Sequence, residues 1–403
     1  MSDMTLDVPP HVYDQVPPPF DVDAVASPAF VVDMGLLRAN LAKISAVQEA
    51  AGCTVLLALK GFSMFSTFPL VRQYLSGCCA SGLHEAMLAR QEFDREVHVY
   101  APFFKEEEMR EIIPIADHIS FNSLRQWRTF RPMLDEARAA GLRVPSPGLR
   151  VNPEHSEVEI ALYDPCSPGC RLGTRAQSLE GEDLSGLEGL HFHALCEQNS
   201  DVLERMVAAV EKRFPRLLEQ VSWVNMGGGH HITRNDYDVE RLVNLIQTFR
   251  ARWGKKVYLE PGEAIALNTG YLIATVMDIV ATGDMPTAIL DVSATAHMPD
   301  TLEMPYRPLI FGSGMPGELA HTYRLGGPTC LAGDVINEFS FPQPLEIGQR
   351  LAFADMAHYT MVKTTTFNGV PHPDIVIHDG EASGDKLRLV KRFGYEDFRN
   401  RLS

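Results

Sequence analysis

Eight short apolar runs, separated by segments with helical spacing, constrain the fold of this chain more than any other feature. Strands that alternate with helices form βαβ units, and these units build a parallel sheet. Eight such strands in one domain favour closure, so we predict an α/β fold with a (β/α)8 TIM barrel. The expected strands are Thr54–Lys60, Gly77–Ser81, Val97–Pro102, His118–Ser123, Gly148–Asn152, Gly189–Glu197, Val221–Gly229 and Lys256–Gly262.

The pattern differs at the two ends of the chain. The first 26 residues contain three consecutive prolines and several acids, which is typical of a surface arm. After about residue 270 the helical segments give way to strand-like runs with Gly and Pro turns, such as Thr287–Val292, Arg350–Phe353 and Asp374–His378. We therefore expect an arm over 1–26, the barrel over 27–269, and a second, mostly β domain over 270–403.

Charge and cysteine content narrow the class of protein. With 36 Lys and Arg against 52 Asp and Glu, the chain lacks the basic character of a nucleic-acid binder, although solubility alone would explain an acidic surface. Apolar stretches such as Ile273–Val280 are broken well before the ~20 residues that span a bilayer. Seven cysteines and no signal-like start favour a cytoplasmic location. Cys166 and Cys170 have no matching second pair, so no metal site is predicted.

Polar residues gather at the expected strand ends, where the chemistry of such barrels is carried out. Lys60 ends the apolar strand TVLLALK, and a sheltered position there would favour the neutral, nucleophilic amine. A lysine turned toward solvent is the ordinary alternative. The polar residues at these ends are Lys60, Ser81, Asn122, Arg150, Asn152, His193, Cys196, Glu197, Gly227 to Gly229, and Glu260.

Three further strand ends suggest cofactor chemistry. Gly227, Gly228 and Gly229 follow the seventh strand, where backbone N–H groups would cradle a phosphate, unless the run is only a flexible loop. Glu260 opens the rigid turn EPGE. If its carboxylate faces a pyridine nitrogen, it would keep that nitrogen protonated. The alternative is that EPGE is a surface turn in which the acid is solvated. Alternation along the sixth strand puts His191 and His193 on the same side, so we expect one of them to point into the barrel. The alternative for His193 is a hydrogen-bonded core histidine without a role in chemistry.

Seven ordered motifs give the chain a resemblance to the alanine racemase and ornithine decarboxylase superfamily of pyridoxal phosphate enzymes. The resemblance covers nearly all of the chain after residue 27, and it is closest to the carboxynorspermidine and carboxyspermidine decarboxylase branch. The motifs are ALKGFS (Ala58–Ser63), FHALCE (Phe192–Glu197), NMGGG (Asn225–Gly229), EPGEA (Glu260–Ala264), HMPDTLEMPYRP (His297–Pro308), CLAGD (Cys330–Asp334) and YTMVKTTTFNG (Tyr359–Gly369).

The resemblance implies a role for individual residues around pyridoxal 5'-phosphate. Lys60 would carry the cofactor as a Schiff base, His193 would stack on its ring, and Glu260 would pair with the pyridinium nitrogen. Gly227, Gly228, Gly229 and Tyr359 would hold the phosphate.

The same resemblance implies a homodimer with shared active sites. Cys330 would donate a proton in the partner subunit's site, and Asp334 would bind the substrate amine there. Glu197, Glu263, Asp300 and Glu303 are further candidate contacts for the amines of a polyamine-type substrate.

One departure from the superfamily bears on the substrate. Arg usually stands where this chain has Glu263, so a cation is replaced by an anion that would attract an amine, and diaminopimelate is disfavoured. The expected reaction is decarboxylation of carboxynorspermidine or carboxyspermidine to norspermidine or spermidine. These two substrates differ by one methylene, which is worth only about 1–3 kcal/mol of discrimination. A decarboxylase of ornithine or diaminopimelate, a racemase, and a non-catalytic pyridoxal phosphate carrier are the alternatives.

Overall fold

The computed structural model of the chain describes residues 15–283, 285–383 and 386–403. It divides into two compact units. Residues 40–265 form the barrel unit, and the chain before and after them forms the sheet unit. Each unit is described on its own.

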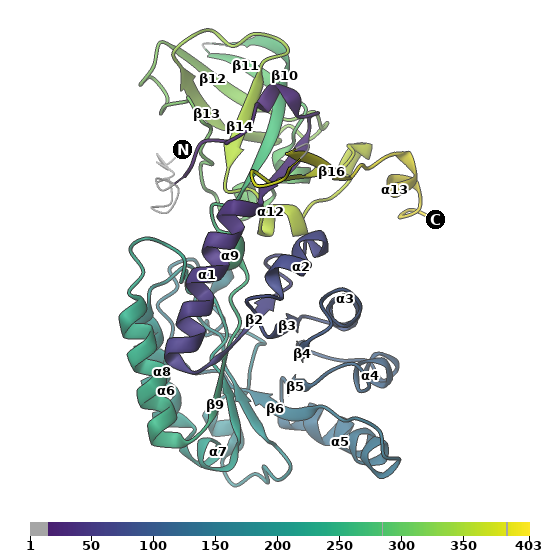
Figure 1. Cartoon of the computed structure of the whole chain (residues 1–403), viewed down its shortest axis with the longest axis vertical. Coiled ribbons are helices and arrows are strands. Elements are labelled where there is room, and N and C mark those ends of the chain that lie inside the picture. The colour runs from purple at the N-terminus through teal and green to yellow at the C-terminus, as the bar shows by residue number, and fades with distance from the viewer. Residues whose placement is uncertain (1–14, 284, 384–385) are drawn as a thin grey trace. The chain divides into compact units, whose positions relative to one another are not determined.

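Eight parallel strands close into a barrel, as the sequence predicts, with β2 hydrogen-bonded to both β3 and β9. All eight strands end earlier than expected. The largest difference is in β7, which ends at His191, and the chain beyond it forms the loop that carries His193. Figure 1 shows the helices outside the ring of strands. The strands are β2 (Thr54–Ala58), β3 (Gly77–Ala80), β4 (Glu96–Tyr100), β5 (His118–Phe121), β6 (Ser146–Arg150), β7 (Gly189–His191), β8 (Trp223–Asn225) and β9 (Lys256–Leu259).

The longer helices of this unit have the start signals and apolar faces that their sequences imply. The side chains of Ser123, Asn199 and Asp238 accept hydrogen bonds from backbone N–H groups at the start of α5, α6 and α8. Gly254 ends α8 in a left-handed conformation. The helices are α1 (Met34–Ala51, which begins in the sheet unit), α2 (Phe68–Val71), α3 (Leu83–Leu88), α4 (Glu106–Ile112), α5 (Leu124–Ala139), α6 (Ser200–Arg213), α7 (Pro215–Gln220), α8 (Val239–Trp253) and α9 (Glu263–Ala266).

A large aromatic side chain fills part of the barrel interior. Trp223 packs in a buried cluster with Leu56 and Tyr258, and its indole N–H donates to Ser146 Oγ at 2.8 Å. A Cβ atom on Gly189 would lie 1.9 Å from the Trp223 ring. Glycine is therefore required on the strand beside this ring.

Gly189→Ala should lower the free energy of unfolding by about 1–3 kcal/mol, because the added methyl group overpacks the interior against Trp223. Urea unfolding followed by circular dichroism measures the change. Gly394→Ala is the matched control, since a Cβ there meets open space and the backbone has a φ of −141°. Equal stability of the two variants would contradict this account of the barrel interior.

The described residues of the sheet unit form eight strands, and the mostly β second domain is confirmed. Its core includes Leu272, Val276, Phe339 and Phe353. Strand order is β13-β12-β11-β10-β1-β15-β16, with β14 paired to β10. The elements are β1 (Ala29–Asp33), β10 (Gly270–Thr282), β11 (Met285–Leu290), β12 (His321–Gly326), β13 (Val335–Phe341), β14 (Arg350–Ala354), β15 (Asp374–His378) and β16 (Leu387–Lys391), with helices α10 (Ala294–His297), α11 (Asp300–Glu303), α12 (Tyr359–Val362) and α13 (Tyr395–Arg399).

Strand β1 changes the domain division expected from the sequence. It pairs antiparallel with β10 and parallel with β15, so residues 29–33 belong to the sheet unit although the barrel was expected to begin at residue 27. All five residues of β1 are buried, and such a short apolar run looks like a barrel strand in the sequence. Of the expected arm, residues 1–14 lie outside the described residues. Val16, in the described part of the arm, accepts a hydrogen bond at its backbone oxygen from Tyr271 Oη of β10 at 2.9 Å.

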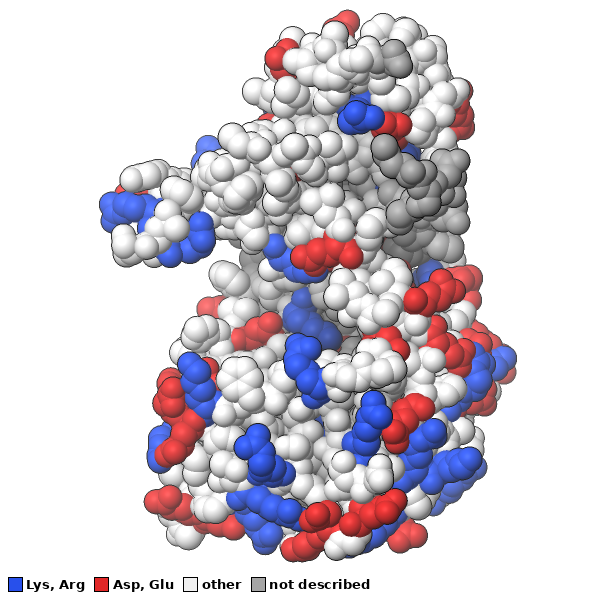
Figure 2. Space-filling model, turned by 180° about the vertical axis from the view of Figure 1, so that it is seen from behind, with Lys and Arg blue, Asp and Glu red and all other residues white. Residues whose placement is uncertain are grey.

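Charged side chains of both signs are interspersed over the barrel unit on the face seen in Figure 2. That face has no continuous field of one sign. Among the described helices, none combines the length and apolar character that a bilayer crossing requires.

Candidate active site

The carboxyl ends of the barrel strands surround a pocket. It brings together four residues to which the sequence gave site roles, Lys60, His193, Gly228 and Glu260. This is the end of a TIM barrel at which catalysis takes place. The pocket is lined by Ala58, Lys60, Cys79, Ala80, Ser81, Tyr100, Arg150, His191, His193, Gly228 and Glu260.

Lys60 lies just beyond β2 and presents its amine to the pocket. Its Nζ is 3.5 Å from His193 Nε2. The surrounding protein atoms lower the pKa of Lys60, although its side chain keeps contact with solvent, and the positive charge of Arg150 lowers that pKa further. A larger fraction of the amine is therefore neutral at neutral pH, which is the form that attacks an aldehyde.

Glu260 follows β9 and is held as an anion. Burial alone would raise the pKa of Glu260, but His191 and the hydrogen bond from Asn225 lower it far below its usual range. Asn225 Nδ2 donates to Glu260 Oε1 at 2.5 Å, and His191 Nε2 lies 3.4 Å from Oε2. A buried carboxylate that stays ionised fits the task of keeping a pyridine nitrogen protonated.

His193 is fixed in orientation by the loop after β8. Its Nδ1 lies 3.0 Å from Gly228 O and 3.1 Å from Gly228 N, so either tautomer makes a hydrogen bond to the same residue. Burial and the neighbouring cations Lys60 and Arg150 lower the pKa of His193 well below its ordinary value. A neutral, fixed ring beside Lys60 fits stacking on a planar cofactor.

The three glycines after β8 are required by close packing. A Cβ on Gly227 would lie 2.6 Å from His193 Cβ, one on Gly228 would lie 2.1 Å from Glu260 O, and one on Gly229 would lie 2.0 Å from Leu195 O. The N–H of Gly227 donates to Asn225 Oδ1, and the N–H of Gly228 donates to His193. Their phosphate-binding role stays a prediction, because packing already explains why glycine stands at these positions.

Arg150 and Tyr100 line the pocket, although the sequence assigned them no role. The Arg150 guanidinium carbon lies 4.3 Å from the centre of the Tyr100 ring, and Nη2 donates to His193 O at 3.0 Å. Arg150 is buried, so its charge acts at short range on Lys60. Its place as the last residue of β6 was the available signal, but nothing in a single sequence states its neighbours.

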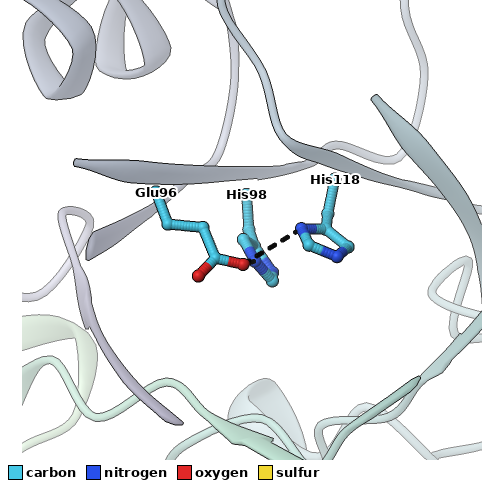
Figure 3. A group of neighbouring side chains, drawn as sticks. All are labelled: Glu96, His98 and His118. Carbon is cyan, nitrogen blue, oxygen red and sulfur yellow. Dashed lines mark hydrogen bonds and ion pairs between the residues drawn. The ribbon is translucent and has the colours of Figure 1, made fainter. Parts of the chain in front are cut away.

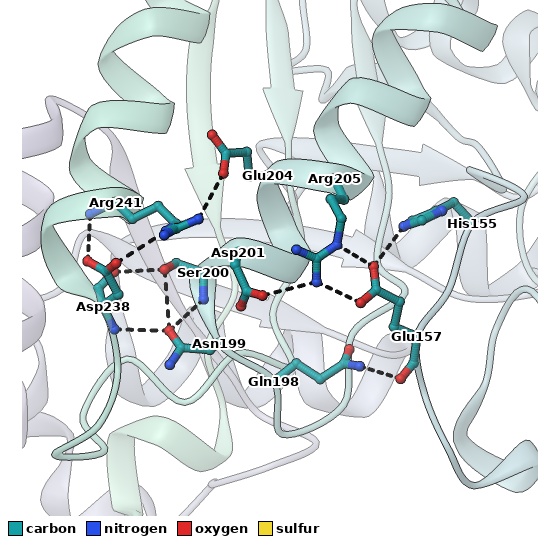
Figure 4. A network of polar contacts seen from close by, with 10 residues as sticks. All are labelled: His155, Glu157, Gln198, Asn199, Ser200, Asp201, Glu204, Arg205, Asp238 and Arg241. Atoms are coloured by element: carbon teal, nitrogen blue, oxygen red, sulfur yellow. Dashed lines mark hydrogen bonds and ion pairs between the residues drawn. The ribbon is translucent and has the colours of Figure 1, made fainter.

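Polar contacts join the loops that follow β6 and β7 to helix α6 (Figure 4). The backbone N–H of Gln198 donates to Gly229 O at 3.2 Å, and its side chain donates to Glu157 O at 2.6 Å. Arg205 of α6 donates two hydrogen bonds of 2.7 Å to the Glu157 carboxylate. These contacts tie the loops after β6, β7 and β8 to one another and limit the freedom of His193.

Two predicted amine contacts in the barrel unit have protein partners. Glu263 Oε2 lies 3.1 Å from Nε2 of the buried His231. Glu197 has a positive φ, and its backbone oxygen accepts a hydrogen bond from Arg234. Their roles toward a substrate remain predictions.

The other predicted site residues belong to the sheet unit. Asp334 is buried, and its carboxylate accepts hydrogen bonds from the hydroxyl groups of Ser293 and Thr329. Cys330 is exposed, and its backbone N–H donates to Asn368 Oδ1 at 2.7 Å.

Asp300 and Glu303, the two remaining predicted amine contacts, both form ion pairs with Lys363. Tyr359 is the first residue of α12 and is half-buried. Any amine bound by Asp300 or Glu303 would compete with Lys363.

Arg150→Met should raise the pKa of the Lys60 amine, because a nearby cation that disfavours protonation is removed. Trinitrobenzenesulfonate labelling of the cofactor-free protein over a pH series, with peptide mass spectrometry of Lys60, measures that pKa. The midpoint should move to higher pH, whereas Arg175→Met at an exposed position should leave it unchanged. A midpoint that stays in place would show that Arg150 does not act on Lys60.

Comparison with known proteins places this chain among decarboxylases. The family model "Pyridoxal-dependent decarboxylase, C-terminal sheet domain" matches residues 11–357. A carboxyaminopropylagmatine decarboxylase of Synechocystis is 47% identical over 94% of this chain and 96% of that protein. A carboxynorspermidine/carboxyspermidine decarboxylase of Campylobacter jejuni is 42% identical over 93% of this chain and 98% of that protein.

Solved structures agree with the fold. The carboxynorspermidine decarboxylase of Campylobacter jejuni, complexed with norspermidine, has a TM-score of 0.85 and 41% identity, over 94% of this chain and 100% of that chain. A diaminopimelate decarboxylase of Helicobacter pylori complexed with L-lysine has a TM-score of 0.76 at 17% identity, over 94% of this chain and 97% of that chain, and so shares the fold. With a family match over most of its length and close relatives over nearly all of it, this chain belongs to the pyridoxal-dependent decarboxylases.

Proposed function

We propose that this enzyme decarboxylates carboxynorspermidine or carboxyspermidine, forming norspermidine or spermidine in polyamine biosynthesis. The observation that carries the proposal is the 42% identity, over nearly full length, to a relative named for these two substrates. A second relative with this name, from Herminiimonas arsenicoxydans, is 36% identical over 94% of this chain.

The residues that line the pocket support this proposal. When bound, pyridoxal phosphate accepts the electron pair that remains after CO2 leaves. Lys60 would hold the cofactor through its amine and give it up to the substrate amine, which the lowered pKa of Lys60 favours. Glu260, ionised in its buried site, would hold a proton on the pyridine nitrogen. His193 would fix the plane of the ring.

Proton return to the α-carbon would come from a second subunit. Cys330 is exposed, so its thiol is accessible to a partner. The proposal therefore includes a homodimer in which Cys330 serves the partner's site as proton donor and Asp334 lies beside it. All seven cysteines are free, which suits a reducing, cytoplasmic location.

A second candidate substrate is carboxyaminopropylagmatine, because the relative named for it is 47% identical over 94% of this chain. It ends in a guanidinium group, whereas the polyamine substrates end in an ammonium group. A guanidinium is planar and binds a carboxylate through two parallel hydrogen bonds, so the two classes demand different arrangements of acids.

The substrate is identified by CO2 release and amine products from the cofactor-loaded enzyme. Carboxynorspermidine, carboxyspermidine, carboxyaminopropylagmatine, ornithine and meso-diaminopimelate are offered in parallel. We expect kcat/KM to be at least about 100-fold higher for a carboxylated triamine than for ornithine, which lacks the distal amine contacts. Preference for carboxyaminopropylagmatine would favour the second candidate. Preference for ornithine or diaminopimelate would refute both, and cofactor binding without CO2 release would indicate a carrier.

The shared active site is tested by mixing two inactive variants, Lys60→Ala and Cys330→Ala. In a dimer with shared sites, each mixed dimer has one site with both groups intact, so an equal mixture should regain about a quarter of wild-type activity. Each variant alone is the control. No recovery after subunit exchange, verified by native mass spectrometry, would place Lys60 and Cys330 of one site on the same subunit or remove Cys330 from the reaction.

A further inference from the structure

Three potential metal ligands meet inside the barrel, at the amino ends of β4 and β5. Glu96 is the first residue of β4, His98 follows two positions later, and His118 is the first residue of β5. Alternation along β4 gives Glu96 and His98 the same side as Tyr100, which lines the pocket at the carboxyl end of that strand. The three side chains point toward one another in Figure 3. They lie at the opposite end of the barrel strands from Lys60.

We propose that Glu96, His98 and His118 form a binding site for a divalent cation of the zinc class. The proposal is independent of the decarboxylase substrate. One ligand atom from each residue falls within a group whose members are all within 4.8 Å of one another. Glu96 Oε1 lies 3.0 Å from His98 Nε2 and 3.3 Å from His118 Nδ1.

These separations suit a metal ion. In a tetrahedral zinc site with bonds of about 2.0–2.1 Å, ligand atoms lie roughly 3.3 Å apart. Two imidazoles and one carboxylate are ligands that zinc and its neighbours in the first transition row accept. Small side-chain rotations are sufficient, and the fourth position is left to water.

His118 Nδ1 contacts Glu96 without a hydrogen bond. This buried nitrogen lies 3.3 Å from Glu96 Oε1, and it makes no hydrogen bond within the part of the chain that the structure describes. Buried polar atoms are normally hydrogen-bonded, so the unused lone pair or N–H of this nitrogen requires an explanation. A metal bond would supply the partner.

Neighbouring side chains hold the candidate ligands in place. Tyr258 Oη donates to Glu96 Oε1 at 2.7 Å, in the way that outer-sphere groups orient a metal-binding carboxylate. The ring of Trp223 packs against His118 with centroids 4.9 Å apart. The site is reached from solvent, since the side chains of His118 and Glu96 are 15% and 21% exposed.

The positive charge of Lys256 would weaken binding of a cation at this site. Its Nζ lies 3.7 Å from Glu96 Oε1, so the ammonium competes with a cation for the same oxygen. The Lys256 side chain is 53% exposed, and its Nζ also lies 4.4 Å from the centre of the Tyr258 ring. Removal of this charge should therefore tighten metal binding, an effect that a purely structural hydrogen-bond network would not produce.

The test uses the full-length, cofactor-loaded protein after chelator treatment and dialysis. Zinc is titrated against a chromophoric competitor, and thermal unfolding is recorded with and without zinc. We expect one equivalent to bind with a dissociation constant in the micromolar range or below, together with a rise in Tm. Cobalt should give visible absorption bands of a tetrahedral site with nitrogen and oxygen ligands, separate from the cofactor absorbance.

Variants decide between this site and adventitious binding, for example by the free cysteines. His118→Ala should lose the equivalent, Lys256→Met should bind at least about tenfold more tightly, and His321→Ala in the sheet unit should match the wild type. Circular dichroism verifies folding, and Glu96→Gln is a second, milder ligand variant. Binding that His118→Ala and Glu96→Gln leave unchanged, or no binding at 100 micromolar zinc in either wild type or Lys256→Met, would overturn the proposal.

Discussion

Closure of the barrel between its first and last strands is the constraint on which the pocket depends. β2 pairs with β9 through Thr54 opposite Tyr258 and Val55 opposite Leu259. Just beyond this pairing, the N–H of Ala58 donates to Pro261 O at 3.0 Å. Lys60 and Glu260 leave these two strands, so closure brings a lysine and a carboxylate from distant parts of the sequence into one pocket.

Within the pocket, the pKa values of Lys60 and Glu260 are both lowered, with opposite effects on the charge of the two groups. Lys60 and Arg150 are cationic neighbours, and the repulsion between them favours loss of the Lys60 proton. Glu260 keeps its charge because His191 and Asn225 stabilise the anion. One pocket therefore combines an amine that loses its proton more readily than an ordinary lysine with a carboxylate that keeps its charge, and both properties fit pyridoxal phosphate chemistry.

The sequence predicted the features that depend on local pattern. Eight apolar runs showed the barrel, and the positions of Lys60, His193 and Glu260 at strand ends predicted which side chains would line one pocket. It could not predict which residues become neighbours across the barrel. The close approach that forces glycine at Gly228 and the pairing of Glu263 with His231 arise from loops that meet only after folding. The place of β1 in the sheet unit was not predicted for a related reason, because its partner strands follow the whole barrel in sequence.

The position of β1 between β10 and β15 also constrains the order in which the two units can fold during synthesis on the ribosome. β1 emerges first, but its two neighbours in the sheet appear only after residues 270 and 374 have been made. The barrel unit, residues 40–265, is contiguous and can fold in the meantime, because domains generally fold as units as they emerge. Throughout this interval, the apolar strand Ala29–Asp33 lacks both of its partner strands, and unpaired strand edges are the parts of a sheet that associate with other chains. The sheet can therefore be completed only after the barrel unit and residues 374–378 have been made.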